Sequence, residues 1–152
     1  MPIEVGDEAP DFELKSQHGQ PVRLSSFRGS KNVVLVFYPW AFTGVCTGEL
    51  SALQAQRPSL DNDTTALLAV SVDSMFALRV FAEQQGLEFP LLSDFWPHGA
   101  TARSYGVFHE DAGAAVRGTF VIDTAGVVRW SVVNGIGDAR DLEEYKKALA
   151  DL

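Results

Sequence analysis

Cysteine is almost absent from this sequence, in which Cys46 is the single one among 152 residues. One cysteine cannot form an intramolecular disulfide, so a small secreted scaffold held together by such bonds is excluded. Histidine is also scarce, because the chain has only three, His18, His98 and His109. These histidines and the cysteine lack the spacing of a metal-ligand set, and we therefore expect no bound metal and no other cofactor.

Basic residues are outnumbered, with 12 Lys and Arg against 20 Asp and Glu, a net charge of −8 and a pI near 4.7. Nucleic acids require a basic surface, and anionic membranes attract runs of basic residues, so we expect neither partner. Long apolar runs are missing as well, since no stretch approaches the roughly 20 residues of a membrane span. The acidic N-terminus lacks the layout of a signal peptide, and we expect a cytoplasmic protein.

The length of the chain favours a single domain covering residues 1–152. The sequence patterns predict strands over 11–14, 22–24, 32–38, 66–72, 89–93, 118–123 and 127–133. They predict helices over 46–56, from Ser74 to Gly86, over 100–105, and from a capping Asp138 onward. This order indicates an α/β domain with a thioredoxin-like fold, in which helices flank a central mixed sheet extended by an N-terminal β-hairpin.

Cys46 ends the segment that begins at Pro39, between the apolar strand 32–38 and the predicted helix. A helix N-terminus has unpaired N–H donors and a positive dipole end, which favour the thiolate, the nucleophilic form of cysteine. A buried structural thiol is the alternative, since free cysteine is often buried. Dithiol exchange is excluded, because Thr43 occupies the first cysteine position of a Cys-x-x-Cys motif. A phosphatase loop is excluded too, because it needs an arginine where this chain has Ala52.

A thiolate at this position still needs a substrate. A cysteine protease would require His98 or His109 as a base, and no local signature marks either one. Attack on a peroxide fits better, because it transfers one oxygen to sulfur and needs only a cation and an aligning hydroxyl nearby. Thr43 supplies the hydroxyl. Arg117 is our candidate cation, because its strand should lie beside the strand that precedes Cys46; a solvated strand-end charge is the alternative.

These residues resemble the signature of the peroxiredoxin family, P-x-x-x-T-x-x-C, through Pro39, Thr43 and Cys46, with a distant arginine matched by Arg117. The resemblance covers nearly the whole chain, including residues 5–12 and the hairpin near the end. It implies a thioredoxin-like peroxidase in which Cys46 is the peroxidatic nucleophile. Thr43 and Arg117 would activate that nucleophile, and Pro39 would shield it from water.

Within the family, residues 41–44 and 91–99 resemble the AhpE-type group of actinobacteria (alkyl hydroperoxide reductase E-like). Other relatives often carry a resolving cysteine five residues after the first, where this chain has Ser51. The resemblance therefore implies a one-cysteine mechanism that reduces hydrogen peroxide, organic hydroperoxides and peroxynitrite. An external thiol would complete the cycle, such as mycothiol with mycoredoxin, or thioredoxin.

The resemblance also bears on partners and on Glu49. Peroxiredoxins commonly pair through loops around the active site, which implies a homodimer or a higher homo-oligomer. Phe42, Phe95 and Trp96 are candidates for the apolar pairing surface. Glu49 is expected in the first turn of the cysteine helix, where a carboxylate suits the dipole, and orienting Arg117 is the alternative. A redox-sensing binding protein, which reacts once without efficient turnover, is the rival to an enzyme.

Overall fold

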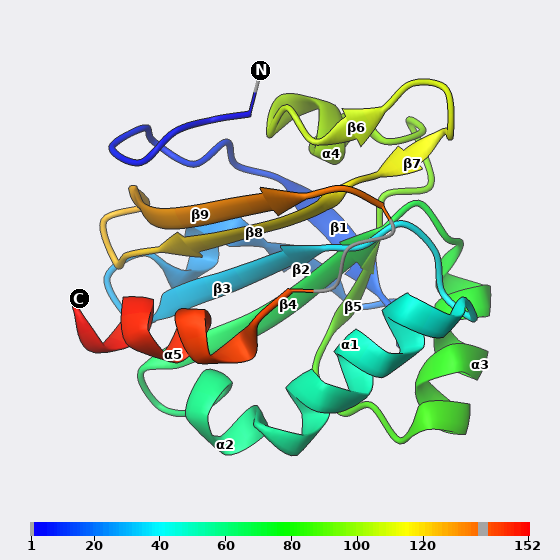
Figure 1. The fold of residues 1–152 in the computed structure, drawn as a ribbon, viewed down its shortest axis with the longest axis horizontal. Helices are drawn as coiled ribbons and strands as arrows, with labels where there is room; N and C mark the ends of the chain where they lie inside the picture. Colours follow the sequence, from blue (N-terminus) through cyan, green and yellow to red (C-terminus); the bar gives the residue numbers. More distant parts are fainter. Residues whose placement is uncertain (1, 137–139) are drawn as a thin grey trace.

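A seven-stranded mixed sheet forms the centre of the computed structural model, which describes residues 2–136 and 140–152. Its strand order is β2-β1-β5-β4-β3-β8-β9 (Figure 1). These strands are β1 (Glu13–Ser16), β2 (Pro21–Arg23), β3 (Asn32–Phe37), β4 (Thr65–Ser71), β5 (Leu91–Ser93), β8 (Arg117–Ile122) and β9 (Val128–Asn134). β3, β4 and β5 run parallel, and the other neighbouring pairs run antiparallel. The predicted mixed sheet and N-terminal hairpin are confirmed.

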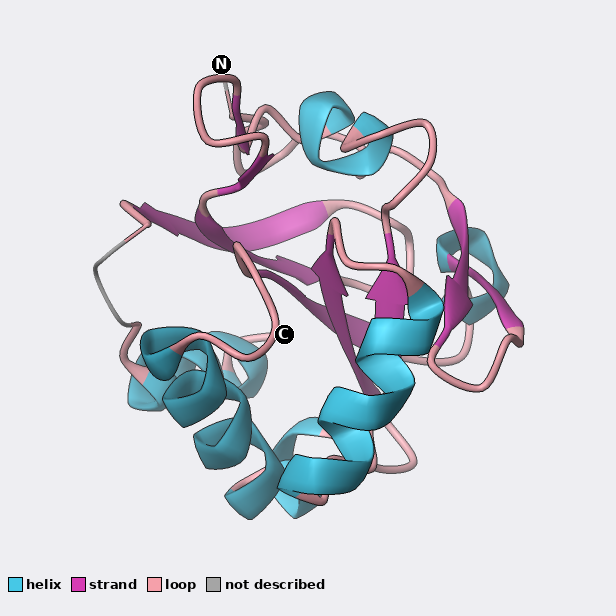
Figure 2. Cartoon of the chain, turned by 90° about the vertical axis from the view of Figure 1, so that its right-hand side faces the viewer, coloured by secondary structure: helices cyan, strands magenta, loops and turns pink. Residues whose placement is uncertain are grey.

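Helices cover both faces of this sheet (Figures 1 and 2). One face carries α1 (Gly44–Ala55), α2 (Arg57–Leu60), α3 (Met75–Gln85) and α5 (Leu142–Ala150). The other face carries α4 (Ala100–Ser104) and a two-stranded ribbon of β6 (Phe108–His109) and β7 (Ala114–Ala115). A short 3-10 helix, Leu24–Phe27, follows β2. Within the described ranges, none of the helices is long and apolar enough to cross a membrane.

The central strands are apolar on both faces because each face is covered. In β3, Val34 and Val36 belong to the hydrophobic cluster beneath α1, α3 and α5, and Leu35 and Phe37 belong to the cluster on the opposite face. All seven residues of β4 are buried. Continuous apolar runs are typical of such doubly covered parallel strands, which is why the sequence predicted these two correctly.

The ends of the helices test the sequence prediction more strictly. Ser74 caps α3 by accepting a hydrogen bond from the Ala77 N–H at 3.2 Å, and Gly86 ends it at φ +66°, both as predicted. α1 begins at Gly44, two residues before the predicted start, because the backbone already turns helical after Thr43. The predicted cap Asp138 lies outside the described residues.

Two boundaries differ from the expectation for physical reasons. α5 begins at Leu142, and the side chain of Asp141 accepts a hydrogen bond from the Glu143 N–H at 3.0 Å. Pro58, which follows the predicted helix 46–56, lies in the first turn of the separate helix α2, a position where its missing N–H costs nothing. The ribbon of β6 and β7 was not predicted, because two-residue strands carry no readable alternation.

Candidate active site

The loop between β3 and α1 places Cys46 in the first turn of α1, where its side chain is completely buried. Thr43 is the N-cap residue, with an extended backbone, and its hydroxyl donates to the Trp40 carbonyl at 2.9 Å instead of capping the helix. Pro39 is buried in the loop two residues after the end of β3, whereas Thr43 is exposed. The sulfur therefore lies at the positive end of a helix whose N-cap residue has an exposed side chain.

Two contacts hold this loop in place. The carboxylate of Asp73, after β4, accepts a hydrogen bond from the Ala41 N–H at 2.8 Å. Phe42 adopts the left-handed backbone region at φ +68°, which is unfavourable for a bulky residue, and its ring packs edge-on against Phe81 of α3 with ring centroids 5.1 Å apart. The strained turn is thus supported by α3, and it directs the chain into α1 at Thr43.

Arg117 reaches the sulfur from the neighbouring strand. β8 pairs antiparallel with β3, and the pair Val36–Thr119 lies two residues from Arg117, which opens β8. Its Nη1 donates to the Cys46 Sγ at 3.3 Å, and its side chain is only 3% exposed. The prediction that the strand of Arg117 lies beside β3, the strand that precedes Cys46, is confirmed, and the interpretation of Arg117 as a solvated strand-end charge is wrong.

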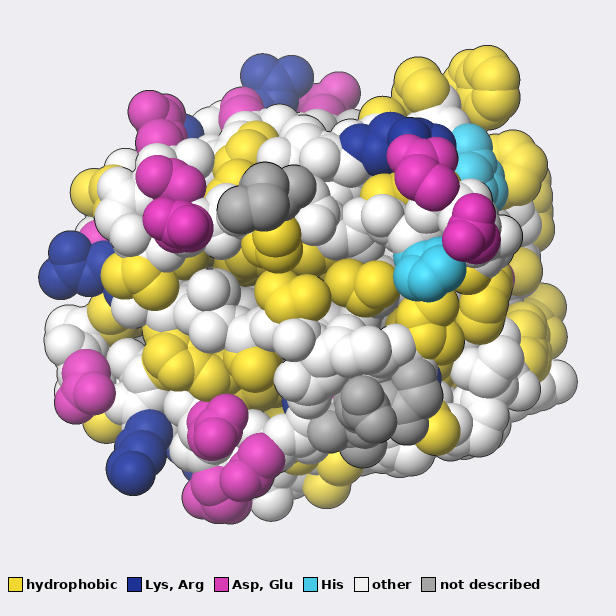
Figure 3. Space-filling view, turned by 45° about the horizontal axis from the view of Figure 1, so that its top comes forward, with side chains coloured by type: hydrophobic (Ala, Val, Ile, Leu, Met, Phe, Trp, Pro, Cys, Tyr) yellow, Lys and Arg dark blue, Asp and Glu magenta, His cyan; other side chains and the backbone are white. Residues whose placement is uncertain are grey.

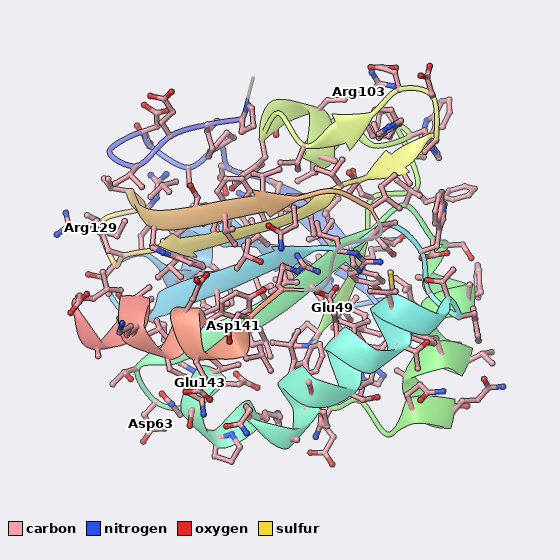
Figure 4. All side chains as sticks on the ribbon, in the orientation of Figure 1. Glu49, Asp63, Arg103, Arg129, Asp141 and Glu143 are labelled. Carbon is pink, nitrogen blue, oxygen red and sulfur yellow. The ribbon has the colours of Figure 1, made fainter. Side chains whose placement is uncertain are left out.

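Glu49 lies three residues after Cys46 in α1, where its side chain points toward the sheet (Figure 4). Because α1 begins at Gly44, Glu49 lies in the second turn, and its expected place in the first turn is wrong. Its Oε1 accepts a hydrogen bond from Arg117 Nη1 at 2.5 Å. The arrangement is the one that the alternative described, a carboxylate against the arginine rather than against the end of the helix.

Arg140, which was not predicted from the sequence, forms an ion cluster with Glu49 and Arg117. Its backbone N–H and Nε donate to Glu49 Oε2 at 2.7 and 3.0 Å, and its Nη2 donates to Oε1 at 2.8 Å. Its Nη1 donates to the carbonyls of Phe37 and Gly118, at 2.6 and 3.0 Å, and thereby joins the ends of β3 and β8. The side chain is 2% exposed. Its only signal in the sequence is an arginine shortly before the last helix, which is not specific.

The charges in this cluster favour an anion at the sulfur. Burial by itself would raise the pKa of Glu49, but hydrogen bonds and charge from Arg140, together with the charge of Arg117, outweigh it and hold that pKa below its ordinary value. Glu49 is therefore ionised at neutral pH. Two guanidinium groups and one carboxylate leave one net positive charge, and a Cys46 thiolate would balance it.

The remaining sequence candidates lie elsewhere. His98 and His109 are exposed, and their ring nitrogens contact the Gly113 carbonyl at 2.6 Å and the Ala112 N–H at 3.1 Å. Neither contact supports the protease alternative. Among the described residues, no group of three or more His, Cys, Asp or Glu side chains is arranged to hold a metal ion. The site contains a buried sulfur, a guanidinium and a hydroxyl, which are the groups that attack on a peroxide requires.

Comparison with known proteins assigns the family. The AhpC/TSA family model matches residues 5–131. Alkyl hydroperoxide reductase E of Mycobacterium tuberculosis is 50% identical over 150 residues, which cover 99% of this chain and 98% of that protein. The chloroplastic 2-Cys peroxiredoxin BAS1 of Arabidopsis thaliana is 36% identical over 158 residues, covering 97% of this chain and 59% of that protein.

A solved structure agrees with these sequence relatives. The crystal structure of peroxidoxin BcpB from Mycobacterium tuberculosis superposes with a TM-score of 0.87 at 31% identity, covering 99% of this chain and 98% of the other. The thioredoxin-like fold predicted from the sequence is thereby confirmed. The chain belongs to the AhpC/TSA family of peroxiredoxins, and it is an oxidoreductase of the thiol peroxidase class.

Proposed function

We propose that this protein reduces peroxides by a one-cysteine mechanism with Cys46 as its nucleophile. The observation that carries the proposal is the 3.3 Å contact between Arg117 Nη1 and the sulfur of the single cysteine. The thiolate attacks one peroxide oxygen, forming an S–O bond as the O–O bond breaks. The bonding electron pair leaves with the other oxygen as hydroxide, alkoxide or, from peroxynitrite, nitrite. Hydroxide or alkoxide then takes up from solvent the proton that the thiol released on ionising, and becomes water or an alcohol. Sulfur loses two electrons and becomes a sulfenic acid.

Each neighbouring group has a role in that step. Arg117 stabilises the thiolate and the charge that builds on the departing oxygen. The Thr43 hydroxyl donates to the Trp40 carbonyl, so its lone pairs are directed elsewhere and accept the peroxide O–H, which aligns the substrate. Pro39 excludes water from the sulfur. Glu49 and Arg140 hold Arg117 in its position.

The second half of the cycle requires a thiol from outside the chain. A thiol displaces water from the sulfenic acid to form a mixed disulfide on Cys46, and a second thiol releases the enzyme by exchange. Mycothiol with mycoredoxin, or thioredoxin, is the proposed reductant, in a cytoplasm that keeps such thiols reduced. The name of the mycobacterial relative, alkyl hydroperoxide reductase E, supports organic hydroperoxides as substrates beside hydrogen peroxide and peroxynitrite.

We further propose that two copies pair beside the active site. Phe42, Phe95 and Trp96 are 52%, 54% and 80% exposed, which is unusual for large apolar side chains. Phe95 and Trp96 also line a groove of about 620 Å³ together with Met75 and Phe76. Hydrophobic side chains gather along the right-hand edge of the face shown in Figure 3, beyond the histidines. Such a surface suits a second copy of the chain.

Peroxide consumption by wild-type protein and Cys46→Ser tests the enzymatic proposal. With excess low-molecular-weight thiol, the wild type should turn over many equivalents of peroxide and Cys46→Ser none, with unchanged circular dichroism. Substantial activity in Cys46→Ser would contradict Cys46 as the nucleophile. Consumption of a single equivalent by the wild type, followed by a stall, would favour a redox-sensing binding protein instead.

A further inference from the structure

The C-terminal helix is connected to the active site by a hydrogen bond that the proposed mechanism does not use. Tyr145 of α5 is 1% exposed, and its Oη lies 2.8 Å from Oγ1 of Thr119 in β8, which is completely buried. The same Oγ1 accepts a hydrogen bond from Arg140 Nη1 at 3.2 Å. Burial raises the pKa of Tyr145, so its phenol is neutral, and either of the two hydroxyls can donate in this contact.

A continuous chain of hydrogen bonds links this contact to the sulfur. Arg140 binds Glu49 with three of its N–H groups, Glu49 binds Arg117 at 2.5 Å, and Arg117 donates to the Cys46 Sγ at 3.3 Å. A displacement of the Arg140 guanidinium therefore moves the carboxylate that fixes Arg117. Hydrogen-bonded chains of this kind act as a unit in a buried, low-dielectric environment.

Packing does not secure Arg140 on the side of α5. A cavity of about 40 Å³ adjoins Arg140 and Glu49 there, and Leu142 and Tyr145 of α5 form part of its wall. Side chains beside a void lose contacts on that side, so polar contacts must define the position of the guanidinium. A threonine side chain in a strand has more than one accessible χ1 rotamer, and the bond to Tyr145 selects the one that aims Oγ1 at Arg140.

We propose that Tyr145 is a positioning residue for the peroxidase site, acting through Thr119 and Arg140 on the contact between Arg117 and Cys46. This inference rests on the proposed function. Docking of α5 against β8 thereby contributes to the reactivity of a sulfur carried by α1, on a different element of the fold. The aromatic ring of Tyr145 has a separate structural task, since it packs edge-on against Trp130 with ring centroids 5.6 Å apart.

The test compares Tyr145→Phe, which keeps the ring and removes the hydroxyl, with Thr119→Val and with the double variant. We expect each single variant to lower the second-order rate constant for peroxide about threefold to tenfold and to move the thiolate titration, followed by ultraviolet absorbance, to higher pH. Because both variants break the same chain, the double variant should lose no more than Thr119→Val alone. Thr119→Ser, which retains the hydroxyl, should restore both values.

Tyr105→Phe is the matched control. Tyr105 is also fully buried, its hydroxyl donates to the Pro10 carbonyl at 2.6 Å, and it lies in the cluster on the opposite face of the sheet. Tyr105→Phe should lose about as much unfolding free energy as Tyr145→Phe, with no change in the thiolate titration or in the rate constant for peroxide. If Tyr145→Phe and Thr119→Val both keep the thiolate titration and the peroxide rate constant of the wild type, the inference is overturned. Peroxide turnover by the wild type would still support the proposed function. If Tyr145→Phe fails to fold, Thr119→Val against Thr119→Ser decides the question.

Discussion

Replacing Arg117 with methionine removes the only cation that the described residues place against the sulfur. The contact is 3.3 Å long and buried, so the bare Coulomb attraction between a thiolate and a full positive charge is about 5 kcal/mol at an effective dielectric constant near 20. Glu49, 2.5 Å from the same nitrogen, offsets part of that charge. We therefore take the value of a charge-assisted hydrogen bond, about 1.5–3 kcal/mol, which corresponds to roughly a tenfold to hundredfold loss of rate.

The variant should fold, because Glu49 keeps its three hydrogen bonds from Arg140 and no buried charge is left alone. Stopped-flow measurement of sulfenic acid formation gives the rate constant, and absorbance of the thiolate gives its titration, which should move to higher pH. Arg117→Lys should recover part of the rate, since it restores the charge without the planar guanidinium.

Arg103→Met serves as the control for loss of an arginine. Arg103 belongs to α4, on the opposite side of the sheet from Glu49 (Figure 4), where it pairs with Glu110, and its side chain is 47% exposed. Arg103→Met should form the sulfenic acid at the wild-type rate, and its thiolate should titrate as in the wild type. If Arg117→Met and Arg103→Met react at the same rate and titrate at the same pH, Arg117 is not the activating cation and the electrostatic argument fails.

Two other predictions concern the ion cluster and the proposed pairing surface. Glu49→Gln should cost about 3–5 kcal/mol of unfolding free energy at pH 7, because it leaves two buried guanidinium groups without their carboxylate. The pKa of Glu49 is lowered by folding, so its contribution to the free energy of unfolding is complete above the ordinary value of 4.5 and is lost as the pH falls through the folded value. Denaturant titrations should therefore show that the difference in unfolding free energy between wild type and Glu49→Gln narrows only in acid. A difference that stays constant down to pH 3 would contradict the ionisation of Glu49. Trp96→Glu should convert a dimer to a monomer in sedimentation, with an unfolding free energy within about 0.5 kcal/mol of wild type. Val5→Glu, at another exposed position, should leave the dimer intact. A dimer that persists in Trp96→Glu would exclude the proposed pairing surface.

Local chemistry in the sequence was enough to predict several parts of this molecule. Ser74 and Gly86 delimit α3 because capping and left-handed backbone conformations depend on single residue types. Arg117 was placed beside Cys46 because strand adjacency follows from the fold class. These predictions used only short-range preference or known topology.

Other parts depend on tertiary contacts that no local pattern encodes. Arg140 binds a carboxylate 91 positions away, and nothing around it in the sequence marks an arginine that will be buried. Glu49 was expected in the first turn because helix starts are uncertain by a residue or two, and that placement favoured the helix dipole as its partner, whereas the structure pairs it with Arg117 and Arg140. The bond between Thr119 and Tyr145 joins two residues that each look like ordinary core positions.

Stepwise addition of peroxide to the reduced protein, followed by intact-mass spectrometry, tests the one-cysteine mechanism most directly. Without reductant, Cys46 should gain one oxygen and then a second as the sulfenic acid proceeds to sulfinic acid, with loss of activity, because the chain has no second thiol to intercept it. A small thiol added before the peroxide should instead give one mixed disulfide per chain and preserve activity. Disulfide-linked dimers as the main product would show that Cys46 reaches its counterpart in another copy, and they would contradict resolution by an external thiol.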